Sequence, residues 1–282
     1  MRQIVSAQSV PLGPERVMQP LPNDQVDQID PFLLIHHASF SVQKGAHPRN
    51  AGVGPHPHRG FSPVTFIFEG SIHHRDSLNN SKVVYEGGTQ WMHAGRGITH
   101  SERPGKEMIE NGGANEIIQF WVNTPSAHKM DAPFYQPISK EDTPVILKEN
   151  AEIAVVAGEL DGVKGPAKAL TPLTLLRINL KDSASVELDI RADFNTLLYV
   201  LNGSMEINGS DVRAKQMVWF HNDGERLEIS ASEDTRAILL SGAPIGEEVA
   251  KYGPFVMNTQ TEIMEALRDS QMGKMGVLIE EF

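Results

Sequence analysis

Four side chains that can bind a transition metal occur in two short segments of the chain. The first segment, Pro55-His56-Pro57-His58, places two histidines one residue apart, and the second segment, 93–102, ends with His100 and Glu102. Side chains alternate along an extended strand, so the two members of each pair lie on one face. Three imidazoles and one carboxylate suit Fe, Ni, Mn, Cu or Zn better than Ca or Mg. The sequence therefore predicts a transition-metal site where these segments meet.

The composition limits the classes of protein that could hold such a site. The 282 residues are 40% hydrophobic and 22% charged, which is typical of a globular protein with a sizeable core. A net charge of −11 argues against direct binding to nucleic acid or to an anionic membrane. The chain has no cysteine, which excludes disulfides and thiolate ligands. No apolar run approaches the ~20 residues that span a bilayer, and no signal peptide is evident, so we expect a cytoplasmic protein.

Short strands and turns dominate the chain, and the second half repeats the first. The segment 196–204, Thr-Leu-Leu-Tyr-Val-Leu-Asn-Gly-Ser, resembles 63–71, and Trp219-Phe220-His221 resembles Trp91-Met92-His93. Repeated strand-turn units of this kind predict an all-β fold with two barrels, because a closed barrel leaves no sheet edge exposed. Prolines between residues 125 and 144 separate the two halves.

The second half serves as an internal comparison for the metal site. We align the halves on Gly70 with Gly203 and on Trp91 with Trp219, and no metal-binding position of the first half then falls on a histidine. The positions of His56, His58, His100 and Glu102 fall on Asp189, Arg191, Glu228 and Ser230. The sequence therefore predicts a second barrel without a metal site.

A few short helices are expected near the C-terminus. Thr259 to Glu262 reads as a capping box, and Ile263, Met264 and Leu267 form an apolar stripe that predicts a helix ending near Gly273. A shorter helix is expected over 247–252.

These segments resemble a known family. The His-x-His pair, followed by Gly70, matches the first cupin motif, and 87–100 resembles the second. Pro-His-Pro-His-Arg-Gly-Phe at 55–61, together with 91–102, resembles the pirin family of bicupins. The resemblance implies two cupin barrels (double-stranded β-helix, or jelly-roll) in tandem. It implies an N-terminal cupin domain over 1–135 with the metal site and a C-terminal cupin domain over 136–282 without one.

The resemblance also implies a ligand set. Many cupins place a glutamate ligand five residues after the second histidine, where this chain has Pro63, which cannot bind a metal. Pirins supply the carboxylate from a later position. The implied ligands of one divalent metal, Fe(II) with Ni, Mn, Cu or Zn open, are His56, His58, His100 and Glu102.

The remaining histidines are expected to be structural. Alternation turns either His73 or His74 inward, toward the site, and His93 is expected to be structural or to lie close behind the ligands. Where pirins more commonly carry acidic residues, this chain has His36-His37. The structural group also includes His128 and His221.

Pirins and related bicupins are associated with quercetin 2,3-dioxygenase activity. The resemblance implies a metal-dependent dioxygenase that cleaves a flavonol such as quercetin with O2, with Glu102 as both metal ligand and catalytic base. An alternative is an iron-bearing, redox-sensitive regulatory protein that binds a transcription factor or a metabolic enzyme. A third is a storage or sugar-binding cupin. We expect a monomer in each case.

Overall fold

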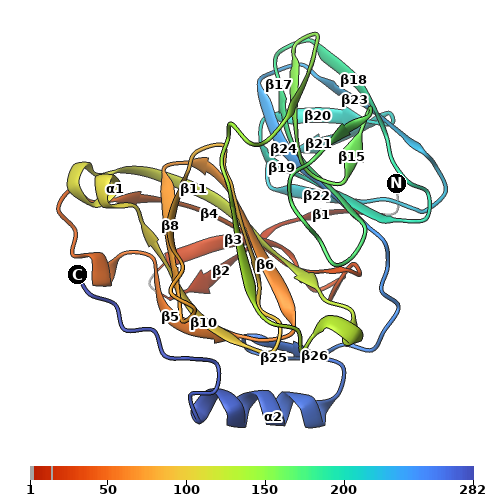
Figure 1. The fold of residues 1–282 in the computed structure, drawn as a ribbon. Coiled ribbons are helices and arrows are strands. Elements are labelled where there is room, and N and C mark those ends of the chain that lie inside the picture. The colour runs from red at the N-terminus through yellow and green to blue at the C-terminus, as the bar shows by residue number, and fades with distance from the viewer. Residues whose placement is uncertain (1–2, 14) are drawn as a thin grey trace. The chain divides into compact units, whose positions relative to one another are not determined.

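The computed structural model describes residues 3–13 and 15–282 (Figure 1). Contacts divide the chain into two compact units, one of Met1–His36 with Glu141–Ile245 and one of His37–Lys140 with Gly246–Phe282. We call the second the site unit and the first the companion unit. Both consist mainly of antiparallel strands, which confirms the predicted all-β fold. The division into cupin domains at residue 135 stays a prediction.

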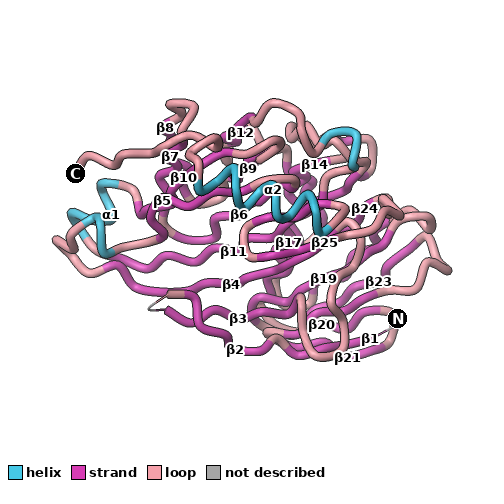
Figure 2. Tube along the Cα trace, turned by 90° about the horizontal axis from the view of Figure 1, so that it is seen from below, coloured by secondary structure: helices cyan, strands magenta, loops and turns pink. Residues whose placement is uncertain are grey.

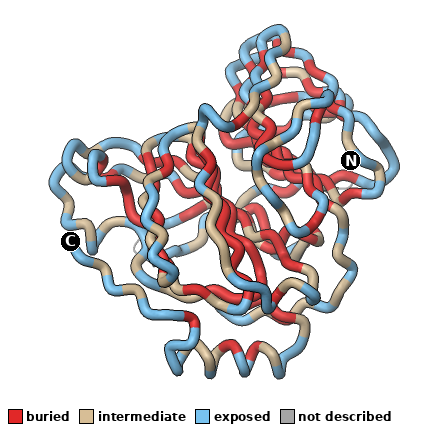
Figure 3. Tube along the Cα trace, in the orientation of Figure 1, coloured by how far each residue is buried: buried red, intermediate tan, exposed pale blue. Residues whose placement is uncertain are grey.

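The site unit contains two larger antiparallel sheets and the two-stranded hairpin of β25 and β26. One has the strand order β5-β10-β7-β8, and the other contains β12-β9-β6-β11-β4. Large apolar side chains fill the core, among them Phe66, Trp91 and Phe120, and the buried trace follows the central strands in Figure 3. The strands are β4 (Phe32–Val42, whose first residues belong to the companion unit), β5 (Val53–His58), β6 (Phe61–Glu69), β7 (Ser71–Asp76), β8 (Ser81–Tyr85), β9 (Thr89–His93), β10 (Ile98–Pro104), β11 (Gly113–Asn123), β12 (Phe134–Ile138), β25 (Ala250–Tyr252) and β26 (Phe255–Met257).

The companion unit has the same plan. Its seven-stranded sheet has the order β1-β22-β19-β24-β17-β14-β13, and a four-stranded sheet has the order β18-β23-β20-β21. The strands are β1 (Gln3–Ser6), β2 (Gln8–Leu12), β3 (Glu15–Leu21), β13 (Val145–Lys148), β14 (Ala151–Ala157), β15 (Glu159–Leu160), β16 (Val163–Lys164), β17 (Leu173–Leu180), β18 (Ala184–Asp189), β19 (Asn195–Asn202), β20 (Ser204–Ile207), β21 (Ser210–Arg213), β22 (Gln216–Trp219), β23 (Arg226–Ala231) and β24 (Thr235–Gly242).

The inward positions of the companion unit differ from the predicted ones by one residue. Leu188 pairs with Leu227 across β18 and β23, as His56 pairs with His100 across β5 and β10. Both leucines are buried in an apolar core that also contains Ile229. The prediction of Asp189, Arg191, Glu228 and Ser230 for these positions was wrong. Because the side-chain period of a strand is two, a shift of one residue turns every side chain to the other face.

The longer helix forms where the capping box predicted it. Helix α2 (Gln260–Gln271) begins after Thr259, which accepts a hydrogen bond from the backbone N–H of Glu262 while the Glu262 carboxylate accepts one from the backbone N–H of Thr259. It buries Ile263 and Ala266, whereas Met264 is exposed, so the predicted stripe was wrong at that residue.

The shorter helices differ from the predicted ones. The helix expected over 247–252 does not form, and β25 there pairs with β26 instead. A short helix that the sequence did not predict, α1 (Lys106–Asn111), precedes β11 (Figure 2). Over 3–13 and 15–282, none of the helices has the length and apolar character needed to cross a membrane.

Candidate metal centre

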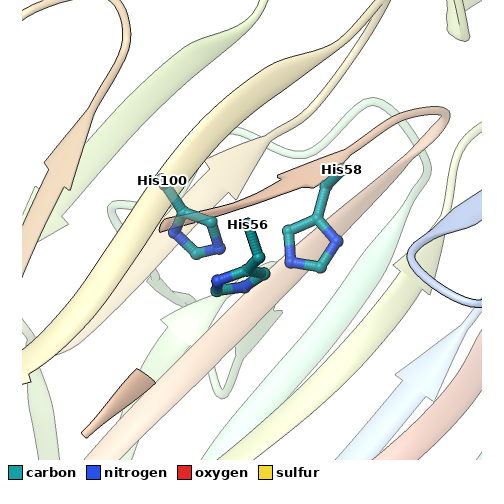
Figure 4. Close-up of side chains that lie close together, drawn as sticks. All are labelled: His56, His58 and His100. Atoms are coloured by element: carbon teal, nitrogen blue, oxygen red, sulfur yellow. The ribbon is translucent and has the colours of Figure 1, made fainter. Parts of the chain in front are cut away.

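Three of the four predicted ligands lie together in the site unit. His56 and His58 project from one face of β5, and His100 projects from β10, where it pairs directly with His56. One ring nitrogen from each histidine lies within 4.8 Å of the others. The ring centroids are 4.7 Å apart for His56 and His58 and 4.3 Å apart for His56 and His100. Figure 4 shows the three rings turned toward one another, as alternation along the two strands predicted.

Hydrogen bonds hold the Nδ1 atom of each ring and leave Nε2 available. His56 Nδ1 donates to the carbonyl oxygen of Gly54 at 2.8 Å, and His58 Nδ1 donates to that of Pro254 at 3.3 Å. The Nδ1 atom of His100 lies 3.3 Å from Nδ1 of His74. Among the described residues, buried His100 Nε2 has no hydrogen-bond partner. A buried polar atom without a partner is rare in proteins, and a metal ion would satisfy it.

The environment keeps two of these rings in the neutral form that binds metals. Burial lowers the pKa of His100 well below its ordinary value of 6.5, and the neighbouring His56, His58 and His74 lower it further. Burial and His56 likewise lower the pKa of His58, although the hydrogen bond to Pro254 opposes the shift. Neutral imidazoles offer a lone pair to a metal without first losing a proton. The donor set therefore fits a transition metal.

Glu102 lies nearby but does not belong to the cluster of imidazole nitrogens. Strand β10 pairs regularly with β7, where His100 lies opposite Asp76 and Glu102 lies opposite His74, so His100 and Glu102 share one face of β10; the register shift is confined to the pairing with β5. Two amide groups hold the carboxylate: Gln90 Nε2 donates to Oε1 at 2.8 Å, and Gln119 Nε2 donates to Oε2 at 2.9 Å. Tyr135 in turn donates its hydroxyl hydrogen to Gln90 Oε1. The assignment of Glu102 and the three histidines as ligands stays a prediction.

Two aromatic rings border the cluster beside His58. Phe61 lies 5.1 Å and Trp121 lies 5.7 Å from the His58 ring, measured between centroids. Phe61 is fully buried, while Trp121 is half-buried. Arg59, which follows His58, donates to Asp269 Oδ2 of α2 and to the carbonyl oxygen of Arg96.

Of the remaining histidines in this region, one contacts the cluster and three bond to other side chains. His74 faces inward and contacts His100, whereas His73 faces outward and bonds Ser81. This confirms that alternation turns one of the two toward the site. Burial lowers the pKa of His93 to about 4, and its Nδ1 lies 3.3 Å from the Ser62 hydroxyl. His37 pairs with Glu116 at 3.0 Å.

The sequence did not predict the groups that hold the three histidine rings in place. The carbonyl of Pro254, which orients His58, is 196 residues away along the chain. Asp76 accepts a hydrogen bond from His74 at 3.0 Å, and the sequence offered only one signal for it, the spacing His74-x-Asp76 on one face of a strand. Gln90 and Gln119 had no signal, because an amide on a strand reads as an ordinary polar residue.

The fold and the site define a class: a bicupin with three histidines clustered in one barrel and an apolar core in the other. The family model described as Pirin matches residues 14–122, and the model described as Pirin C-terminal cupin domain matches residues 175–276. The chain belongs to the pirin family.

Relatives extend over most of the chain. Pirin-like protein 2 of Arabidopsis thaliana is 38% identical over 257 residues, which cover 88% of this chain and 76% of the relative. Human Pirin is 34% identical over 269 residues, covering 93% of this chain and 88% of the relative. A crystal structure of quercetin 2,3-dioxygenase from Acinetobacter baumannii is 33% identical, with a TM-score of 0.92 and 98% of each chain covered. The predicted bicupin fold is thereby confirmed.

Proposed function

We propose that this protein is a metal-dependent dioxygenase that cleaves a flavonol such as quercetin with O2. The observation that carries the proposal is the cluster of three imidazoles with a free, buried Nε2 on His100, next to a carboxylate held by two amides. The similarity to a quercetin 2,3-dioxygenase of Acinetobacter baumannii supports the substrate class. In this reaction both oxygen atoms of O2 enter the ring-opened product, and one ring carbon leaves as carbon monoxide.

His56, His58 and His100 would hold the metal, with Glu102 as a further ligand. A bound divalent transition metal supplies a positive centre that lowers the pKa of a substrate hydroxyl. The chain itself supplies the proton acceptor, because Glu102 is buried and its oxygens accept hydrogen bonds from neutral amides. Gln90 and Gln119 fix the direction of the carboxylate. The half-buried Trp121 offers apolar ring surface beside His58 for an aromatic substrate, and buried Phe61 packs against it with centroids 4.3 Å apart.

The test is oxygen uptake with quercetin by the metal-loaded protein and by Glu102→Gln. The glutamine keeps the size of the side chain but cannot accept the proton, so kcat should fall by about 10²- to 10⁴-fold. Glu69→Gln, on the exposed end of β6, is the matched control and should keep full activity. Uptake by Glu102→Gln at the level of the control would refute the role of Glu102. Absence of uptake with any flavonol would refute the proposed reaction.

We propose Fe(II) as the metal, with Ni, Mn, Cu and Zn as alternatives that the same ligand types accept. Metal analysis of protein purified without added metal distinguishes these ions. A monomeric state and a cytoplasmic location are part of the proposal. Size-exclusion chromatography with light scattering tests the first, and fractionation of the native cells tests the second.

The second candidate function is regulatory, and membership of the pirin family favours it, with human Pirin 34% identical. We propose in this case that iron oxidation changes the affinity for a protein partner, a transcription factor or a metabolic enzyme. Binding to one such partner, measured with the Fe(II) and Fe(III) forms, should then differ at least tenfold, with no flavonol turnover. Equal affinity of the two forms would contradict a redox-controlled role.

A further inference from the structure

His100 contacts His74, which forms a buried pair with Asp76. The proposed reaction uses neither residue of this pair. His74 lies on β7, and its ring stacks on Tyr135 with centroids 3.8 Å apart and planes 6° from parallel. Its Nε2 lies 3.0 Å from Asp76 Oδ2, and its Nδ1 lies 3.3 Å from His100 Nδ1. The side chains of His74 and Asp76 are 1% and 0% exposed, so water cannot supply other partners.

Asp76 fixes the direction of this hydrogen-bonded chain. Its Oδ1 accepts from the backbone N–H groups of Leu78 and Asn80, at 2.9 and 3.0 Å, and its Oδ2 accepts from Asn80 Nδ2 at 2.7 Å as well as from His74. A carboxylate has about four acceptor sites, and all of them are used here. Burial raises the pKa of Asp76, but the hydrogen bonds from His74 and Asn80 outweigh it and keep that pKa below its ordinary value.

The ionised Asp76 carboxylate determines which ring nitrogens of His74 and His100 carry hydrogens. An ionised carboxylate only accepts, so His74 Nε2 carries a hydrogen, and in the neutral His74 that we propose, Nδ1 is an acceptor. His100 Nδ1 must therefore be the donor in the contact between the two histidines. With its hydrogen on Nδ1, His100 has its lone pair on Nε2, the atom for which the described residues provide no hydrogen-bond partner.

The companion unit provides an independent comparison. Ile207 pairs with Ile229 across β20 and β23, as His74 pairs with Glu102 across β7 and β10. Ile207 is fully buried in the apolar core, in the barrel where the histidine positions are also apolar. A barrel of this kind therefore folds without a polar pair at this position. The His74–Asp76 pair occurs in the barrel that has the histidine cluster, which links the pair to the site and not to the fold.

We propose that Asp76 and His74 are positioning residues that hold His100 in its Nδ1–H tautomer and thereby direct the His100 Nε2 lone pair at the metal. The inference rests on the metal site of the proposed function. Hydrogen bonds of this kind, from the far nitrogen of a metal-binding histidine toward a carboxylate, raise the basicity of the ligand and fix its ring. Here a second imidazole relays the effect of the carboxylate.

Asp76→Asn is the decisive variant. The backbone donors of Leu78 and Asn80 keep the amide oxygen at the Oδ1 position, so the amide NH2 must occupy the Oδ2 position, where it donates to His74 Nε2 and requires the Asn80 side-chain amide to turn its oxygen toward it. His74 then carries its hydrogen on Nδ1, facing the hydrogen on His100 Nδ1. The contact survives only if the hydrogen of His100 moves to Nε2, where it blocks the metal.

The experiment combines two readouts. Nitrogen-15 NMR of the metal-free protein reports the tautomer of His100, and competition with a chelator reports the Zn(II) affinity. We expect wild type to carry the hydrogen on Nδ1. Asp76→Asn should shift it to Nε2 and lower the affinity about 10- to 100-fold. His74→Leu, which imitates the apolar position of the companion unit, should fold and lose affinity to a similar extent.

Two further variants separate positioning from a general structural effect. His74→Asn places an amide oxygen near the former Nδ1, so it should keep the His100 tautomer and bind Zn(II) within tenfold of wild type. His73→Gln changes the outward histidine of the same strand and should leave both readouts unchanged.

The outcomes distinguish this inference from the proposed function. A wild-type His100 with its hydrogen on Nε2, or an Asp76→Asn variant with unchanged tautomer and unchanged affinity, would overturn the positioning role. The NMR result does not require metal or substrate. If the tautomer and the affinity change as expected but no flavonol is consumed, only the proposed reaction fails.

Discussion

Replacing Gly60 by alanine should weaken both the site unit and its metal site. Gly60 follows the His58-Arg59 pair and has φ of +85°, a conformation that costs an alanine about 1–2 kcal/mol. An alanine Cβ would also lie 1.9 Å from the carbonyl oxygen of Val256 and 2.9 Å from the sulfur of Met257. Such contacts fall below 3.0 Å, the limit for real Cβ atoms, so β26 must move by about 1 Å.

That movement has a cost that can be estimated from the structure. Overpacking of this kind costs about 1–3 kcal/mol, because it disturbs the hydrogen bonds from the backbone of Arg59 to Pro254 and from Val256 to Arg59. The total loss in the free energy of unfolding should be about 2–5 kcal/mol. The Pro254 carbonyl moves with the strand, so His58 loses its Nδ1 partner, and Zn(II) affinity should fall about 10- to 100-fold.

Gly253→Ala is the matched control for this variant. Gly253 lies in the same hairpin with φ of 53°, but its Cβ would have no heavy atom within 4 Å. It should therefore lose only the conformational 1–2 kcal/mol and keep its metal affinity. Guanidinium unfolding of the metal-free proteins, followed by tryptophan fluorescence, and Zn(II) competition measure the two quantities. Equal losses in Gly60→Ala and Gly253→Ala would refute the role assigned to the contact with β26.

Three further predictions concern stability. Burial lowers the pKa of His36 to about 4, so the unfolded chain binds more protons between pH 6.5 and 4, and the free energy of unfolding falls as the pH drops through this window. By pH 4, His36→Gln should lose about 3 kcal/mol less than wild type in urea unfolding; parallel pH profiles would contradict this. Lys129→Met removes an ammonium that donates to three oxygens, at 2.7, 2.7 and 3.1 Å, and should cost about 2 kcal/mol at pH 7. An unchanged melting temperature would contradict that estimate. Leu188→Ala should cost about 2–5 kcal/mol, whereas exposed Asp189→Ala should stay within about 0.5 kcal/mol; the reverse order in denaturant unfolding would refute the observed register.

Local patterns were sufficient to predict the cluster of histidines. The single residue between His56 and His58 fixes their common face, and the repeated glycine and tryptophan motifs identify the second barrel. The capping box at Thr259 identifies the start of α2 because its two hydrogen bonds involve residues only three positions apart. In each case, the interaction that determines the structure lies within a few residues.

The other features depend on pairing that no local pattern encodes. Spacing gives the common face of His100 and Glu102 but not what lies opposite it, so it could not place the carboxylate between Gln90 of β9 and Gln119 of β11. The alignments on Gly203 and on Trp219 missed the inward residues of β18 and β23, respectively, by one. Partners far along the chain, such as Pro254, follow from the tertiary fold alone.

The hairpin of β25 and β26 has a consequence for the order of events during protein synthesis. His56, His58 and His100 leave the ribosome early, but the carbonyl that orients His58 belongs to Pro254, and Arg59 is tied to Asp269. Residues 246–282 share a contact unit with 37–140. A nascent chain that ends before residue 254 thus has all three imidazoles but lacks a partner for one of them. The His58 ring should therefore reach its final orientation only after this hairpin has been translated.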